Sequence, residues 1–103
     1  MSDFTVIYSD TAIDEIRDMR RYISHDLDNP EAARKWYRKI ISSAESLAAF
    51  PKRYGVRCQD SYGNDMRVFP VKKYNILYSV NDSNNTVNIS RVIYGGRDID
   101  SLI

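Results

Sequence analysis

Arginine side chains on strand-like segments are the groups in this chain that are best suited to chemistry. Arg67 lies in the run 66–71, Arg91 lies in the run 86–94, and Arg97 follows a Gly-Gly pair. A guanidinium can hold a carboxylate or a phosphate through two parallel N–H donors. These arginines are therefore candidates for anion binding, although an exposed tail charge is the plainer interpretation of Arg97.

Arg91 has two structural alternatives. Strict alternation along the strand places it on the same side as Val87, Ile89 and Ile93. A charge on an apolar face is costly unless it is paired or reaches water. Either Arg91 makes a hydrogen-bonded pair, or a β-bulge turns it outward.

Basic residues are concentrated in the middle of the chain. The formal net charge is only +1, yet residues 30–79 carry ten Lys and Arg against four Asp and Glu. Proteins that dock on a phosphate backbone usually have a clear overall basic excess, which this chain lacks. A local basic surface is still expected if the fold gathers the middle segment. Its residues on the second helix and in the following loop are Arg34, Lys35, Arg38, Lys39, Arg53 and Arg57.

Other familiar chemical signatures are missing. The single cysteine, Cys58, cannot form a disulfide within the chain, and with the single histidine, His25, it makes no zinc motif. We interpret Cys58 as an inert, half-buried thiol and His25 as a solvated residue at a helix end, rather than part of a Ser–His–Asp relay. No metal or cofactor is expected. No apolar run suits a membrane span or a secretory signal, so we expect a cytoplasmic protein.

Hydrophobic periodicity predicts the elements that position these residues. Ile16, Met19, Ile23 and Leu27 recur at helical spacing, which predicts an amphipathic helix over 11–27. Asn29 suits the cap of a second helix that begins at Pro30, and Pro51 ends that helix.

Alternating and β-branched runs predict strands over 4–8, 66–71, 74–80 and 86–94, a loop over 51–65 and a short helix in the tail 97–103. Residues 1–103 should form one α+β domain in the order β-α-α-β-β-β. A two-helix hairpin would cover one face of a four-stranded, mainly antiparallel sheet, and the other face would stay open.

Several fragments together resemble the RelE/ParE family of toxins from bacterial type II toxin–antitoxin systems. They are the opening strand with Ala12–Ile16, the helix start 29–33, the helix end 47–51, the paired runs 67–71 and 74–78, and the ending 91–99, Arg-Val-Ile-Tyr-Gly-Gly-Arg-Asp-Ile. The resemblance covers nearly the whole chain and implies the fold just described. It also implies a toxin that is neutralised by a cognate antitoxin.

The resemblance is closer to the ParE branch. RelE-type members cleave mRNA on the ribosome with an arginine directly after the tyrosine of the third strand, where this chain has Asn75. Asparagine supplies no positive charge for the scissile phosphate. The resemblance therefore implies a ParE-like toxin of a plasmid-stabilisation module that arrests growth by binding DNA gyrase. Such a toxin is not an enzyme and does not itself read DNA sequence. The basic helix and loop would bind the antitoxin or the target.

Two alternatives stay open. A RelE-like endoribonuclease would use Arg67, Arg91, Tyr94 and Arg97, with an arginine clamping the phosphate and Tyr94 as a phenolic acid in the place where a histidine is common. A degenerate family member would bind its antitoxin without harming the cell.

Overall fold

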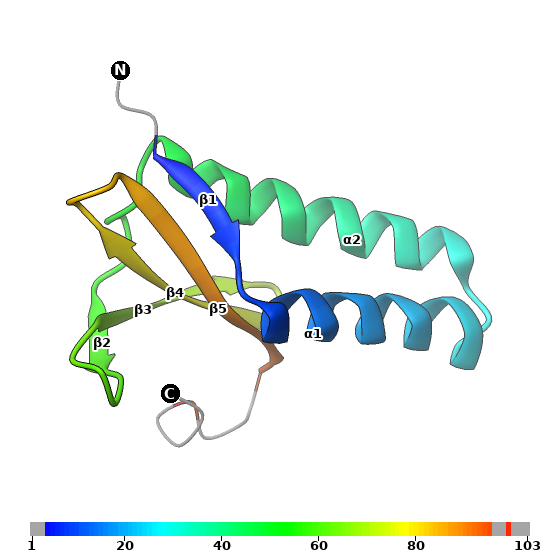
Figure 1. The fold of residues 1–103 in the computed structure, drawn as a ribbon. Coiled ribbons are helices and arrows are strands. Elements are labelled where there is room, and N and C mark those ends of the chain that lie inside the picture. Colours follow the sequence, from blue (N-terminus) through cyan, green and yellow to red (C-terminus); the bar gives the residue numbers. More distant parts are fainter. Residues whose placement is uncertain (1–3, 96–98, 100–103) are drawn as a thin grey trace.

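Two helices lie against one face of a twisted five-stranded sheet in the computed structural model, which describes residues 4–95 and 99 (Figure 1). The elements in chain order are β1 (Thr5–Tyr8), α1 (Asp10–Arg21), η1 (Tyr22–Asp26), α2 (Pro30–Glu45), η2 (Ser46–Ala48), β2 (Val56–Gln59), β3 (Asp65–Val71), β4 (Tyr74–Asn81) and β5 (Thr86–Tyr94). The predicted α+β class, with a helical hairpin on a mainly antiparallel sheet, is confirmed.

Side-chain caps determine where both helices begin. The Ser9 hydroxyl accepts the Ala12 N–H at 2.9 Å, and the Asn29 side-chain oxygen accepts the Ala32 N–H at 3.1 Å. Pro30 follows at the first helical position, where its missing N–H costs no hydrogen bond. The predicted Asn29 cap is confirmed.

The first helix departs from its prediction near its end. The segment 11–27 is α-helical only as far as Arg21 and continues as a π-helical turn, η1. The Leu27 N–H donates to the Tyr22 carbonyl at 3.1 Å, which is the longer bond that widens such a turn. The second helix stops before Pro51, as predicted.

The sheet has five strands where four were expected. Its order is β1-β5-β4-β3-β2, with β1 parallel to β5 and the other pairs antiparallel. The extra strand β2 lies inside the segment 51–65, which was wrongly predicted to be a loop. It is short, mostly exposed and bulged against β3. Its residues Val-Arg-Cys-Gln do alternate, but an alternation over only four residues in a segment with Pro and Gly is a weak strand signal.

The main core fills the space between the helices and the sheet. Its largest fully buried side chains include Ile40 and Leu47 from the helical hairpin and Ile76, Tyr78 and Ile89 from the sheet. Burial of these apolar side chains is the main force that holds the helical hairpin on the sheet. No helix in the described part of the chain is both long and apolar enough to cross a membrane.

The opposite face of the sheet is not fully open, which corrects the expectation from sequence. Met66, Leu77 and Ile93 form a second, smaller cluster there, and Ile99 from the tail packs on it. The rest of the predicted tail helix, with Arg97, lies outside the described residues. Among the described residues, Ile99 of the tail covers part of this face of the sheet, which the residue pattern did not indicate.

A β-bulge in β5 decides which way its arginine faces. Leu77 pairs with Arg91 and Tyr78 pairs with Ile89, so Ser90 is the extra residue on β5. Val92 therefore joins Ile89 on the helix-bearing face, whereas Arg91 lies on the other face. The expectation that Arg91 shares a face with Ile89 is wrong, because the bulge named in the second alternative is present.

Candidate functional site

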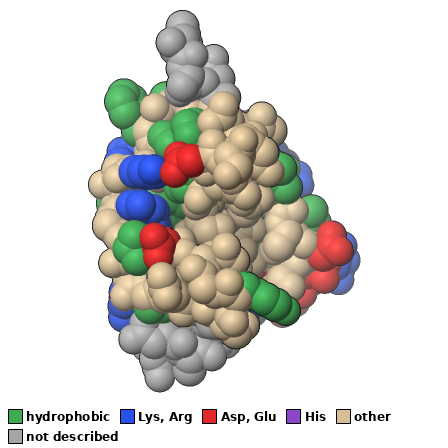
Figure 2. Space-filling model, turned by 60° about the vertical axis from the view of Figure 1, so that its left-hand side comes forward, with side chains coloured by type: hydrophobic (Ala, Val, Ile, Leu, Met, Phe, Trp, Pro, Cys, Tyr) green, Lys and Arg blue, Asp and Glu red, His purple; other side chains and the backbone are tan. Residues whose placement is uncertain are grey.

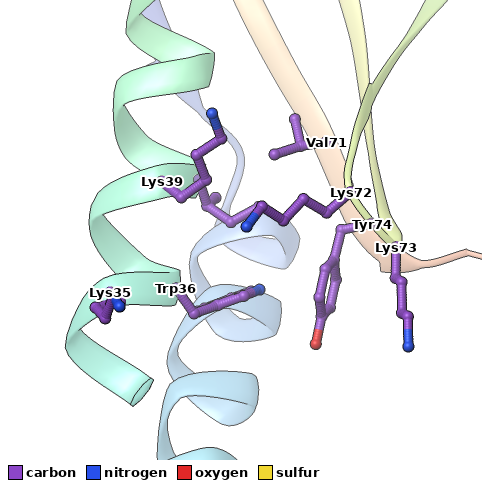
Figure 3. A pocket seen from close by; sticks show the side chains of 8 residues that line it. Lys35, Trp36, Lys39, Val71, Lys72, Lys73 and Tyr74 are labelled. Carbon is purple, nitrogen blue, oxygen red and sulfur yellow. The ribbon is translucent and has the colours of Figure 1, made fainter. Parts of the chain in front are cut away.

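A pocket of about 460 Å³ lies between α2 and the tight turn that joins β3 to β4 (Figure 3). Its lining residues are Lys35, Trp36, Lys39 and Ile40 from α2 and Val71, Lys72, Lys73 and Tyr74 from the turn. The floor is apolar and aromatic, and four lysines contribute to the rest of the lining. The pocket thus combines buried apolar surface with a cationic rim.

The turn that carries two of these lysines has a constrained backbone. Val71 pairs with Tyr74, so the turn consists of Lys72 and Lys73 alone. Lys72 has a φ of 55°, in the left-handed region that glycine and asparagine favour. In Figure 3 its side chain extends from the turn toward α2, over the ring of Trp36.

Gly95, directly after β5, fixes this turn through a backbone hydrogen bond. Its N–H donates to the Lys73 carbonyl at 2.6 Å. A Cβ atom on this glycine would stand only 2.7 Å from the same carbonyl oxygen. The close approach of the two backbones therefore requires glycine at this position.

Three aromatic rings form a row from the pocket floor to the end of β5. Trp36 and Tyr74 meet edge to face with ring centroids 5.3 Å apart, and Tyr74 meets Tyr94 in the same way at 5.3 Å. Burial raises the pKa of Tyr74 above its ordinary value, with smaller contributions from Tyr94 and Tyr22, so its phenol is neutral at physiological pH. The indole nitrogen of Trp36 is buried and has no hydrogen-bond partner in the part of the chain that the structure describes.

Arg91 is paired with a carboxylate from α1. Its Nε and Nη2 atoms lie 2.8 and 2.6 Å from one oxygen of Glu15. The other oxygen of Glu15 accepts the Val92 N–H at 2.9 Å. The two side chains are 24% and 21% exposed, so the pair is largely shielded from water. The first alternative, a hydrogen-bonded pair, is thus also confirmed.

Arg67 is engaged elsewhere. Its Nη1 atom donates to the Tyr54 carbonyl at 2.7 Å. The Tyr54 ring stacks on Phe69 with centroids 4.6 Å apart, and the Arg53 guanidinium lies 5.4 and 5.1 Å from these two ring centres. Tyr78 is fully buried in the same region, and burial raises the pKa of its phenol. This cluster packs β3 against the segment after η2.

A family model described as the ParE toxin of the type II toxin–antitoxin system parDE matches residues 6–99, from β1 to the tail. The chain belongs to this family of ParE toxins. It is a toxin of a type II toxin–antitoxin system, as the sequence resemblance implied. No curated protein matches the chain.

Several solved structures contain a chain with the same fold as this ParE-family chain. One similar chain comes from the chromosomal ParDE system of P. aeruginosa, with a TM-score of 0.72 at 15% identity over 89% of this chain and 96% of that one. Another comes from the RelBE2 toxin–antitoxin complex of Mycobacterium tuberculosis, with a TM-score of 0.68 at 20% identity over 94% and 97%. A third comes from the archaeal RelE–RelB complex of Pyrococcus horikoshii, with a TM-score of 0.64 at 17% identity over 93% and 99%. At these identities the likeness establishes the fold alone.

The four candidate catalytic residues are not gathered in the described part of this ParE toxin. Arg67 shares the helix-bearing face with Phe69, whereas the bulge puts Arg91 on the opposite face with Ile93. Tyr94 packs on Tyr74, half exposed, at the end of β5. Arg97 lies outside the described residues. The two described arginines therefore do not face one common phosphate site.

The predicted basic surface is divided by the fold. Lys35 and Lys39 line the pocket, whereas Arg34 pairs with Glu31 at 3.3 Å on the exposed side of α2. Arg38 is also exposed on α2. Arg53 lies past the far end of that helix, with Nη1 3.2 Å from the Ser46 hydroxyl.

Arg57, the last of these six residues, is exposed on β2. Figure 2 shows the end of the molecule that includes β2, where Lys and Arg side chains follow one margin with Asp and Glu beside them. The six residues therefore do not form one continuous patch.

Sequence reasoning missed Lys72 and Lys73. A signal was present, because the predicted strands 66–71 and 74–80 leave only these two residues for the turn. Their proximity to Lys35 and Lys39 needed the packing of α2 on the sheet. His25 is exposed and Cys58 is half-buried. The described residues contain no group of three His, Cys, Asp or Glu side chains that could hold a metal ion.

Proposed function

We propose that this ParE-family toxin arrests growth by binding a protein target, DNA gyrase, in the cytoplasm, and that it does not cleave RNA. The observation that carries the proposal is the separation of the two strand arginines. Arg91 is paired with Glu15, and Arg67 is held by the Tyr54 carbonyl on the other face of the sheet. An arginine whose charge a carboxylate already balances is poorly placed to stabilise extra charge on a phosphate.

The strand position of Asn75 supports the same conclusion. Asn75 pairs with Pro70 on one side and with Ile93 on the other, in the middle of the sheet. An amide there brings no positive charge to the sheet surface. For a toxin that acts by protein contact this absence has no consequence, whereas a ribonuclease would need another cation.

Induced expression in growing cells tests the proposal. We expect growth arrest with DNA damage, and purified gyrase should accumulate covalent DNA cleavage complexes when the toxin is added. Translation should continue, and primer-extension mapping of ribosome-bound mRNA should show no codon-specific cuts. Codon-specific cuts without gyrase complexes would replace the proposal with the endoribonuclease alternative. Growth unaffected by a folded, expressed protein would favour the degenerate member.

A cognate antitoxin is the second partner that we propose. Similar folds occur in a ParDE toxin–antitoxin system and in the RelBE2 and RelE–RelB toxin–antitoxin complexes. The basic residues of α2, Arg34, Lys35, Arg38 and Lys39, with Arg53 and Arg57 beyond it, are proposed to bind the antitoxin or the target. Antitoxins of this kind commonly order a flexible segment when they bind, and such a segment can follow a divided surface. Co-expression with the cognate antitoxin should restore growth.

A further inference from the structure

We propose that the pocket between α2 and the β3–β4 turn receives an acidic peptide segment that places one apolar side chain on the floor and carboxylates among the lysines. The inference rests on the proposed function in one respect, since the antitoxin is the protein that would supply the segment. The inference goes beyond that function by naming the pocket in which the segment binds and the residue types that the segment contains.

Charge is the first argument. Lys35, Lys39, Lys72 and Lys73 all line one hollow, and the lining contains no carboxylate. In Figure 3 the Lys72 side chain extends across the hollow, whereas that of Lys73 points away from α2. None of these four lysines is in an ion pair with another described residue, whereas Arg17, Arg34 and Lys52 all have a carboxylate partner. Like charges left together around a pocket repel one another, and an acidic occupant would relieve that repulsion.

The pocket floor is the second argument. Trp36, Tyr74, Ile40 and Val71 present aromatic and aliphatic surface beside the lysines that share the lining. An apolar centre with a charged rim is the usual anatomy of a protein-binding hot spot, and tryptophan and tyrosine are enriched there. The Trp36 indole N–H is buried and has no hydrogen-bond partner among residues 4–95 and 99, and its nitrogen points toward Tyr74 in Figure 3. A carbonyl or carboxylate of the occupant would satisfy this donor after a small adjustment of the ring.

The backbone of Lys72 is the third argument. A lysine at a φ of 55° is less stable than glycine or asparagine would be at the same position. Residues kept in such conformations gather at functional sites, where the strain is compensated by what the side chain does. Here the strained residue is the one whose ammonium group extends across the pocket toward α2 (Figure 3).

The same features favour a peptide over a nucleotide or an RNA strand. Tyr74 meets both Trp36 and Tyr94 edge to face, so these rings do not form a parallel slot for a base. The pocket lining has no arginine for two-pronged phosphate binding. The cap of α2 is already occupied by Asn29, so no free helix N-terminus faces a phosphate.

The single tryptophan of the chain provides a direct readout. Trp36 is the only tryptophan among the 103 residues, so uniformly ¹⁵N-labelled toxin gives one indole N–H signal. Unlabelled cognate antitoxin is added, and binding is measured in parallel by calorimetry. We expect the indole signal to shift in proportion to the bound fraction.

Matched variants then assign the charge contribution. Lys72→Asn removes the ammonium while keeping a residue that accepts the left-handed backbone, and we expect about threefold to tenfold weaker binding. Lys52→Asn removes one charge at a site that pairs with Asp82 outside the pocket, and it should change the affinity less than about twofold. Tripolyphosphate and a single-stranded oligonucleotide, each at matched charge concentration, should leave the indole signal nearly unchanged.

The outcomes separate this proposal from the proposed function. Antitoxin binding without an indole shift, or equal losses from the two asparagine variants, overturns the pocket and leaves the toxin–antitoxin pairing intact. An indole shift with tripolyphosphate or the oligonucleotide as large as that with antitoxin overturns the peptide as occupant. Complete absence of antitoxin binding overturns the partner itself, and with it the source of the segment.

Discussion

Glu15 binds Arg91 and the backbone of the next residue at the same time, although 76 residues separate the two side chains in the sequence. Beyond its parallel pairing with β1, which ends at Ile89, β5 would expose unpaired N–H groups. Helix α1 runs beside this stretch, and the carboxylate of Glu15 caps the Val92 N–H there. One acidic side chain thus closes a sheet edge and neutralises an arginine.

Breaking this pair should destabilise the fold. We expect Glu15→Ala to lower the free energy of unfolding by about 2 kcal/mol, because a largely shielded arginine and a strand N–H both lose their acceptor. Urea denaturation measures the change. A double-mutant cycle with Arg91→Met should show coupling of at least about 0.5 kcal/mol. Strict additivity of the two single changes would contradict the structural role of the pair.

A methyl group at Gly95 should be costly. The added Cβ of Gly95→Ala would stand 2.7 Å from the Lys73 carbonyl, so the turn or the end of β5 must move. We expect a loss of about 1–3 kcal/mol in thermal or urea unfolding. Gly55→Ala is the matched control, since nothing lies within 4 Å of its added Cβ. Equal stability of the two variants would show that the close approach to Lys73 is not needed.

Replacing Lys72 by glycine should stabilise the protein. Its left-handed φ strains a lysine but not a glycine, and relief of that strain is expected to add about 0.5–1 kcal/mol. Lys73→Gly, at the neighbouring turn position without a positive φ, should be neutral or destabilising. The prediction fails if Lys72→Gly unfolds at lower urea concentration than the parent. Together with the weaker antitoxin binding expected for Lys72→Asn, a more stable Lys72→Gly variant would show that Lys72 serves binding at the expense of stability.

High pH should weaken the fold through one buried and two half-buried tyrosines. Burial raises the pKa of Tyr8 well above its ordinary value of 10.0, and its 2.6 Å hydrogen bond to Glu45 raises it further. Burial also raises the pKa of Tyr74 and Tyr78. A raised folded-state pKa means that the neutral phenol stabilises the native state fully below pH 10 and that this contribution is lost as the pH rises further.

The alkaline loss can be assigned by substitution. Unfolding free energies measured across pH 10 should fall less steeply for Tyr8→Phe than for the parent protein, although the variant also loses the hydrogen bond to Glu45. Tyr62→Phe is the control, because Tyr62 is 89% exposed and should keep the parent slope. A Tyr8→Phe slope identical to that of the parent would remove Tyr8 as a source of the effect.

Charge reversal on α2 should weaken partner binding. Lys35→Glu combined with Arg38→Glu replaces two positive charges with two negative ones at the proposed binding site of an acidic partner. We expect at least about tenfold weaker binding at low salt. The loss should shrink as salt screens the surface. Arg17→Glu with Arg21→Glu on α1 makes the same charge change away from the pocket. If calorimetry shows the same loss of affinity for both double variants, the loss depends on net charge and not on the position of the charges on α2.

Local sequence determined the elements of this protein where side chains act on their own neighbourhood. The Asn29 cap, the Pro30 helix start and the stop before Pro51 follow from hydrogen bonds and sterics within a few residues. Periodicity alone indicated the core stripe of α2 and η2, including Ile40 and Leu47, and Ile16 of α1. It was wrong for Leu27, which is 55% exposed, and it missed the fully buried Ala12. Fragments in order along the chain were enough to indicate the family. The candidate catalytic residues could be named from sequence, but not their relative positions.

Tertiary structure alone decided what depends on partners distant in the sequence. Strand β2 exists because β3 offers it an edge, and the bulge at Ser90 turns Arg91 away from Ile89 toward Glu15. The pocket forms only because α2 packs against a turn more than thirty residues later in the chain. Residue patterns encode which face of an element is apolar, whereas register, bulges and contacts between elements are set when burial and hydrogen bonding are satisfied throughout the molecule at once.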